Sequence, residues 1–237
     1  MPENTSKWFP YYNVHESYYD SSATVELPKK ICDYLLDAPQ YGYTPIDDNS
    51  YPRCRFWKYL YYDGAKPLEN ALPTVTEKME VLFDPNRAEE PPTDKGYRLI
   101  PQIWIKPSQI NAQTRVYVYC GREVPNDNFK IAVSVHFVIW THYTSDLNMK
   151  TDEYNRALAI ESAIIEAFHG LNMSGVGVFG YDKRTHPDCG ARPLYDGDIN
   201  VGRELVLGLE LATTTLQSTG KTDNMPNFNK QGNIKLW

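Results

Sequence analysis

The sequence lacks any long hydrophobic run, since no stretch approaches the ~18 uncharged apolar residues that a membrane-spanning helix needs. Residues 1–13 also lack the basic start and the apolar run of a secretory signal. We therefore expect a soluble chain without a visible targeting segment. An apolar fraction of 41% with 13% aromatic residues still supplies a hydrophobic core for the 237 residues, which excludes wholesale disorder.

Basic charge is also scarce. The chain has 24 Lys and Arg against 30 Asp and Glu, so its net charge is −6. A negative net charge opposes binding to a nucleic-acid backbone over a broad surface, although it leaves room for a local basic patch. We expect no sequence-specific binding of nucleic acid.

Cysteine occurs only four times and never in a CxxC pair. Cys32, Cys54, Cys120 and Cys189 lie far apart, unlike the dense cysteines that cross-link small secreted domains. The spacing predicts free thiols and a reducing compartment.

Catalytic motifs are missing as well, because no GxSxG, SxxK or HExxH pattern is present. Residues 175–180 match GxGxxG, but a phosphate-binding loop needs a strand before the glycines and a helix after them. Here a predicted helix precedes them, which favours a glycine-rich strand. We predict no catalytic and no cofactor-binding residue, and therefore no enzyme.

A polar loop over residues 182–198 is the alternative site. His186 and Cys189 are three residues apart, as in half of a zinc site, but the other half is missing. Carboxylates of the same loop could gather around a divalent cation: Asp182, Asp188, Asp196 and Asp198. A solvated surface loop is the favoured interpretation, so we predict no metal ligand. A metal-dependent hydrolase that uses this loop remains the alternative function.

Aromatic residues are abundant, with 18 Tyr, 5 Trp and 8 Phe. Many of them lie in segments without periodicity, a predicted N-terminal arm over residues 1–24 and a polar C-terminal tail over 216–237. Aromatic side chains that a core does not use are typical of interfaces. The predicted contacts with neighbouring chains or partners are Trp8, Phe9, Tyr11, Tyr12, Tyr18, Tyr19 and Trp237.

Residues 25–215 are predicted to form a single domain. Apolar residues at helical spacing predict a short amphipathic helix over residues 25–37. Eight prolines then make residues 38–97 a loop-rich insertion. Within the insertion we expect a strand over 53–62 and either a hairpin or a short helix over 75–82.

The second half of the chain is more regular. Its most extended pattern is the alternation over residues 129–143, which predicts a long strand with Ser134, His136 and His142 among the residues of its polar face. A helix with apolar residues at three-to-four spacing follows over 151–171. Further strands are expected at 102–106, 115–122, 176–181 and 203–215, with a polar loop over 182–200. The order predicts an α+β fold in which one long helix packs on an antiparallel or mixed β-sheet.

This layout resembles the tail terminator, or tail completion, proteins at the neck of long-tailed bacteriophages. The resemblance rests on the helix near residues 27–36, the strand 129–143, the helix 154–171 and the closing strands 176–181 and 203–213. It covers about 130 residues, and the family has no diagnostic motif and no catalytic residues to transfer. The insertion and both terminal arms depart from its small members.

The resemblance implies a structural virion protein that forms a homo-hexameric ring. Such a ring caps the tail tube and contacts the head-tail connector and, in contractile tails, the last ring of the sheath. DNA passes through its channel, which the acidic balance of this chain suits. The expected location is the virion, with no membrane contact. Another virion part, a head completion or baseplate protein, is the alternative within the same class.

Overall fold

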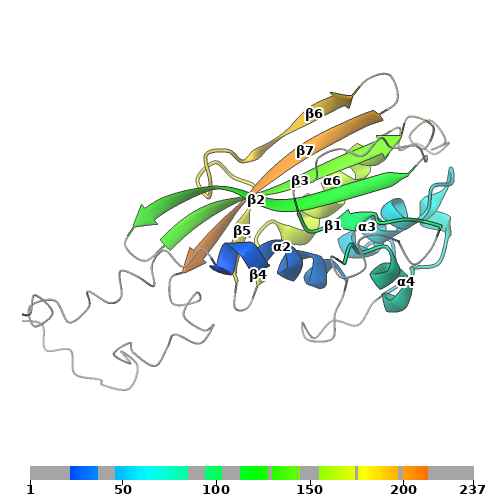
Figure 1. The fold of residues 1–237 in the computed structure, drawn as a ribbon, viewed down its shortest axis with the longest axis horizontal. Coiled ribbons are helices and arrows are strands. Elements are labelled where there is room, and N and C mark those ends of the chain that lie inside the picture. Colours follow the sequence, from blue (N-terminus) through cyan, green and yellow to red (C-terminus); the bar gives the residue numbers. More distant parts are fainter. Residues whose placement is uncertain are drawn as a thin grey trace, which may run out of the picture.

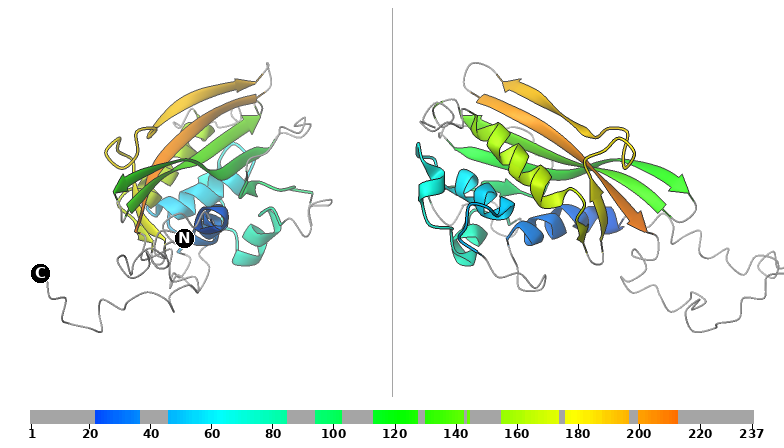
Figure 2. Two further views of the ribbon diagram at one scale, coloured as in Figure 1. Left: turned by 60° about the vertical axis from the view of Figure 1, so that its left-hand side comes forward. Right: turned by 180° about the vertical axis from the view of Figure 1, so that it is seen from behind.

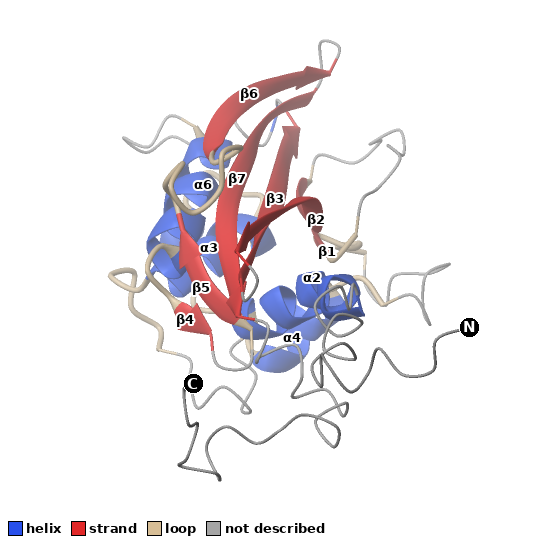
Figure 3. Cartoon of the chain, turned by 90° about the vertical axis from the view of Figure 1, so that its left-hand side faces the viewer, coloured by secondary structure: helices blue, strands red, loops and turns tan. Residues whose placement is uncertain are grey.

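The computed structural model describes residues 22–36, 46–84, 94–102, 113–127, 130–142, 144, 155–173, 176–196 and 200–212. They form an α+β fold in which four helices pack on a mixed, seven-stranded sheet. The sheet curls into a half-barrel, as the view along the strands shows (Figure 3). The predicted fold class is confirmed.

The sheet is built around three long strands. Their bounds are Thr114–Asp127 for β2, Lys130–His142 for β3 and Asn200–Ala212 for β7. The shorter strands are β1 (Leu99–Ile100), β4 (Asn172–Met173), β5 (Gly177–Gly180) and β6 (Gly190–Asp196). The order is β1-β2-β3-β7-β5-β4, with β6 also on β7, and only the β1–β2 pair is parallel (Figure 1).

The helices are α2 (Ser22–Leu35), α3 (Pro52–Tyr61), α4 (Val75–Glu80) and α6 (Arg156–Phe168), with a 3-10 helix at Pro67–Glu69. Seen from behind, α6, α3 and α2 lie together over one face of the sheet (Figure 2). The opposite face, called the outer face below, carries none of the described helices.

The predicted helices around residues 25–37 and 151–171 are confirmed, with shifted ends. The first begins at Ser22, inside the predicted arm. The second begins at Arg156, where the Asn155 side chain accepts a hydrogen bond from the backbone N–H of Leu158, and residues 151–154 lie outside the described residues. It ends before Gly170, whose φ of +78° suits a glycine.

The predicted strand over residues 53–62 is wrong, because this segment is α3. Seven of its ten residues are buried, so aromatic and apolar side chains occur on every side of the helix and hide the helical period. Pro52 occupies the first helical turn, where a missing N–H costs nothing. Of the hairpin or short helix expected over 75–82, the structure has the helix, α4.

The strand predictions mostly hold. The alternation over 129–143 is β3, and the strands at 115–122, 176–181 and 203–215 are β2, β5 and β7 with shifted ends. The expected strand at 102–106 falls almost entirely outside the described residues. The loop predicted over 182–200 is wrong in part, because residues 190–196 form β6 and pair with β7.

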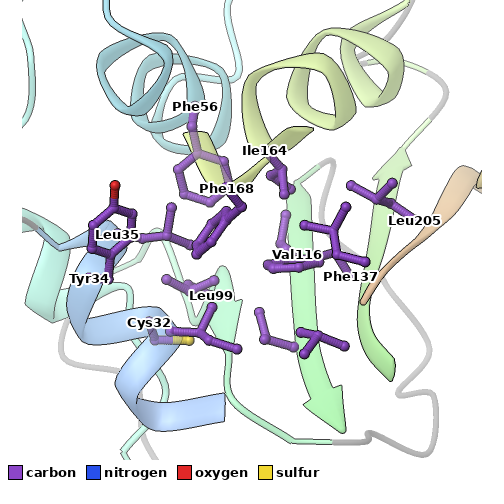
Figure 4. Packing of buried hydrophobic residues seen from close by; sticks show 14 of the residues in the cluster. Cys32, Tyr34, Leu35, Phe56, Leu99, Val116, Phe137, Ile164, Phe168 and Leu205 are labelled. Atoms are coloured by element: carbon purple, nitrogen blue, oxygen red, sulfur yellow. The ribbon is translucent and has the colours of Figure 1, made fainter. Parts of the chain in front are cut away.

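The core lies between the helices and the inner face of the sheet (Figure 4). Phe168 of α6 is at its centre, with ring centroids 5.2 Å from Tyr34, 5.5 Å from Phe137 and 5.0 Å from Phe179. These partners come from α2, β3 and β5. A single aromatic side chain thus connects three elements that are far apart in the sequence.

Two arginines enter the core at the C-terminal end of α3. Arg156 donates hydrogen bonds to the backbone carbonyls of Tyr59, Tyr62 and Gly64. Arg98 donates to the Leu60 carbonyl and forms a bidentate pair with Asp63, with N–O distances of 2.8 and 2.5 Å. Cations at this end of a helix satisfy its last carbonyls and oppose its dipole.

Candidate functional site

The outer face carries a cluster of polar side chains across four neighbouring strands, called the outer-face cluster below. It consists of Tyr119 on β2, Ser134 and His136 on β3, Arg192 on β6 and Glu204 on β7. The sheet register brings them together, because Tyr119 pairs with His136 and Arg192 pairs with Glu204.

A hydrogen-bonded chain connects the serine, the histidine and the glutamate. His136 Nδ1 lies 2.9 Å from Glu204 Oε1, and His136 Nε2 lies 3.2 Å from Ser134 Oγ. The Ser134 hydroxyl also lies 3.2 Å from the Arg122 carbonyl, to which it donates. Ser134 is fully buried, and the His136 side chain is 18% exposed.

Glu204 is held from several sides. Its Oε1 accepts from the Tyr119 hydroxyl at 3.3 Å, and its Oε2 pairs with Arg192 at 2.5 Å. Burial alone raises the pKa of Glu204, but hydrogen bonds from His136 and Arg192 outweigh it and leave the pKa lowered. The carboxylate therefore stays ionised. The Tyr119 ring stacks on the His136 ring at 4.8 Å and an angle of 10°, which fixes the plane of the imidazole.

Glycines flank Ser134 on both neighbouring strands. A register shift between Cys120 and Glu123 gives β2 one extra residue, a β-bulge, at this point. A Cβ added to Gly121 in the bulge would lie 2.3 Å from His136 Nε2 and 2.7 Å from Ser134 Oγ. Gly208 pairs with Ser134 on β7, and its added Cβ would lie 2.9 Å from the Cβ of His186. Neither neighbouring strand therefore places a side chain beside Ser134, and this glycine-flanked position is called the niche below.

Residues 181–189 connect β5 to β6, are called the covering loop below, and pack on Gly208 through Thr185 and His186. Its turns are fixed by hydrogen bonds from the backbone N–H groups of Thr185 and His186 to the Asp182 carbonyl, and by Cys189 Sγ on the Gly180 carbonyl. His186 is 1% exposed and lies against the sheet at Gly208.

The His186 imidazole is incompletely satisfied. Its Nδ1 accepts from the Asp188 backbone N–H at 3.2 Å, whereas its Nε2 is buried without a hydrogen-bond partner. Burial lowers the pKa of His186, with smaller contributions of both signs from Asp188, Arg122 and His136. An orphaned ring nitrogen at the covered niche is unusual, since buried polar atoms are nearly always paired.

The residues predicted from the sequence have different outcomes. The proposed contact residues Trp8, Phe9, Tyr11, Tyr12, Tyr18, Tyr19 and Trp237 lie outside the described residues. His186 and Cys189 do lie in one turn, but burial raises the pKa of the Cys189 thiol. Within the described ranges, no three or more His, Cys, Asp or Glu side chains are grouped so as to hold a metal ion.

Residues 177–180 of the GxGxxG run form a strand, as expected, and Gly175 lies outside the described residues. Gly177 and Gly180 belong to β5, and a Cβ added to Gly177 would lie 2.3 Å from the Glu210 carbonyl oxygen. The first of these glycines thus permits a close approach of β5 to β7. No helix in the described part of the chain is both long and apolar enough to cross a membrane.

Comparisons with known proteins do not place the chain in a family. No protein-family model, no curated protein and no solved structure matches it.

Proposed function

We propose that the chain is a structural subunit of a virion ring, of the tail terminator type, that joins the tail tube and any sheath to the head-tail connector. One observation carries the proposal. The two most exposed large apolar side chains of the described residues lie on opposite sides of the subunit, as a head-to-tail ring contact requires.

Tyr195 of β6 and Val25 of α2 are both 77% exposed, the highest exposed fractions among the large apolar side chains of the described residues. The surfaces around these two side chains are called the apolar patches below. In Figures 1 and 2, β6 and α2 lie on opposite sides of the molecule. Large apolar side chains with smaller exposed fractions are Ile46, Tyr51, Met79, Leu158, Val178 and Tyr181. Different patches on opposite sides favour a heterologous contact over a twofold one.

The strand edges favour contacts through side chains rather than strand addition. Pro193 lies in the middle of the edge strand β6, and Pro125 lies next to a second register shift in β2. Proline and bulges on edge strands oppose pairing with another chain. The apolar patches are thus left as the surfaces through which copies would pack.

The order of elements also supports the proposal. The helix α2, the hairpin of β2 and β3, the helix α6 and the final strands β5 and β7 follow the layout on which the tail terminator resemblance rests. A head completion or baseplate ring would use the same surfaces, and identifying the neighbouring virion proteins distinguishes these three locations.

The test is the mass of the protein by light scattering. The full chain is expected to form a ring near six times 27.3 kDa, and Tyr195→Glu or Val25→Glu, each alone, is expected to give no closed ring. Mixed in equal amounts, the two variants retain one intact contact and should give dimers but nothing larger. Glu123→Lys, at an exposed position of β2, is the control. A full-length monomer at high concentration would overturn the proposal.

A further inference from the structure

The outer-face cluster has the connectivity of an activated serine nucleophile. We propose that Ser134, His136 and Glu204 form an acyl-transfer site beneath the covering loop, and that it takes small carboxylic esters. Ser134 is the nucleophile, His136 is the general base and Glu204 orients the imidazole. This inference is independent of the ring proposal and departs from the expectation that the chain is no enzyme.

The atoms that touch are those the chemistry requires. The nucleophile lies on Nε2 of the histidine at 3.2 Å, and the carboxylate lies on Nδ1 at 2.9 Å. A serine is activated when one imidazole nitrogen takes its proton while the other is held by an acceptor. This constellation is recognised by geometry and not by sequence motifs, so the missing GxSxG pattern does not oppose it.

The Ser134 hydroxyl has two acceptors within reach. It donates to the Arg122 carbonyl when Nε2 carries a proton, and it can donate to Nε2 when the imidazole is neutral and its Nδ1–H donates to Glu204. The bulge in β2 puts that carbonyl beside the hydroxyl. Loss of the Nε2 proton and rotation of one hydroxyl therefore convert a resting into a reactive arrangement without any movement of the strands.

Glu204 is suited to hold the imidazolium that forms during the reaction. Its Oε1 faces Nδ1, while Arg192 and Tyr119 fix the rest of the carboxylate. Since the carboxylate is ionised and the Tyr119 ring stacks on the imidazole, both the negative charge that faces the imidazolium and the plane of the His136 ring are set in advance.

Access to Ser134 requires movement of the covering loop, because Ser134 is fully buried. The Cβ of His186 lies beside Gly208 on β7, and its side chain is close enough to the Arg122 backbone on β2 for the two to interact. The His186 side chain therefore lies across β3, the strand between them that holds Ser134. A departing imidazole vacates a space for an acyl group of about its own size, which defines the substrate class.

The reaction balances without an external oxidant or metal. Ser134 Oγ attacks the ester carbonyl carbon while its proton passes to His136 Nε2. The bond between the carbonyl carbon and the alkoxide oxygen breaks, and the leaving alcohol takes the proton from Nε2. A water molecule then attacks the acyl-serine, with His136 again as base, and releases a carboxylic acid and the free Ser134 hydroxyl.

The test uses the full chain, a fluorophosphonate probe and p-nitrophenyl acetate, with the labelled residue identified by peptide mass spectrometry. His186→Ala and Gly208→Ala are the two uncovering variants, because one removes the ring and the other pushes the loop away. Each is expected to raise the rate of Ser134 labelling about tenfold, as easier local opening would. His136→Gln should lower it about 100-fold, as loss of a general base does.

Matched controls separate reactivity from folding. Gly121→Ala places a Cβ against His136 Nε2 and Ser134 Oγ and is expected to abolish labelling, and Ser134→Ala should abolish both labelling and ester hydrolysis. Ser162→Ala alters an exposed serine that also hydrogen-bonds a carboxylate, at 3.1 Å, and should change neither. The proposal is overturned if folded His186→Ala and Gly208→Ala remain unlabelled at Ser134, or if labelling does not depend on His136.

Discussion

Arg156 shows how much a single buried side chain can hold in place. Its guanidinium is fully buried and donates to three carbonyls at and just beyond the end of α3. Replacing it with Met keeps much of the volume but leaves these acceptors without their donor. Hydrogen bonds to a charged group are worth about 1.5–3 kcal/mol each, whereas Met avoids the cost of burying a charge, so we expect Arg156→Met to lower the free energy of unfolding by about 3 kcal/mol. Urea denaturation measures this, with exposed Arg184→Met as the control.

His186 gives the stability a specific pH dependence. Because burial lowers its pKa, the unfolded chain binds more protons than the folded chain between the folded pKa and the ordinary value of about 6.5. The stability that neutral His186 contributes to the folded chain is fully present above about pH 6.5 and is lost as the pH falls through this window.

The variant that tests this is His186→Phe, which keeps a planar ring but cannot titrate. We expect its free energy of unfolding to fall less than that of the parent when the pH is lowered from about 7 to 5. His169→Gln, at an exposed histidine, should follow the parent. Parallel curves for the parent and His186→Phe would contradict the lowered pKa, because they would show that His186 binds its proton equally well in the folded and the unfolded chain.

At the scale of elements, α4 depends on its first turn. Thr74 accepts from the Glu77 backbone N–H, and the Glu77 side chain accepts from the Thr74 backbone N–H at 2.8 Å, which is a capping box. A helix of six residues has little else to hold it. Thr74→Ala is expected to cost about 1 kcal/mol, with faster hydrogen exchange confined to the amides of α4. Thr74→Ser, which keeps the oxygen, should restore most of the loss.

The strands β5 and β6 give a sharper test of the register. Gly180 pairs with Gly208 and Gly190 pairs with Val206, so both strands run along the same edge of β7 with only Leu207 between their partners. Replacing the covering loop, residues 181–189, with one residue should therefore join them into a continuous strand over 177–196. We expect this variant to fold with the β3–β7 pairing intact, as cross-strand NMR contacts would report, and a loss of that pairing would contradict the register.

The sequence predicted helices and strands correctly where the spacing of apolar residues matches the face that is buried. It failed where burial or strand pairing does not follow that spacing. The spacing of Leu27, Ile31, Tyr34 and Leu35 predicted α2 because only one face of that helix is buried. In α3 the buried residues surround the axis, so the period is lost. The strand β6 was missed because Gly190 and Pro193 signal a loop, whereas pairing with β7 decides its structure.

The candidate site was predictable only in part. Alternation along β3 places Ser134 and His136 on one polar face, which the sequence alone indicates. Glu204 alternates outward on β7 in the same way, but its meeting with His136 depends on the pairing of Val138 with Glu204, 66 residues apart. A one-residue slip would turn every side chain to the other face, so no local pattern could fix that contact.

For the whole molecule, assembly is the property to test first. The predicted arms, residues 1–24 and 216–237, hold the aromatic contacts expected at interfaces. We expect a chain without residues 1–21 and 216–237, which keeps α2 whole, to fold but to form smaller or less stable assemblies by light scattering. Unchanged mass after both deletions would assign assembly to the exposed patches instead.

The position of Arg156 also has a consequence for synthesis. The helix α3 ends at Tyr61, but the cation that completes its last turn is encoded 95 residues later and the other cation is Arg98. A chain that leaves the ribosome from its N-terminus must therefore hold an unfinished, strongly aromatic helix until about two thirds of its length has been made. Contacts of such long range slow folding. While residues 62–156 are being synthesised, the aromatic side chains of α3 must be kept from aggregating, either by a chaperone or because aggregation is slow. The yield in the cell is therefore expected to depend on the rate of translation between codons 61 and 156.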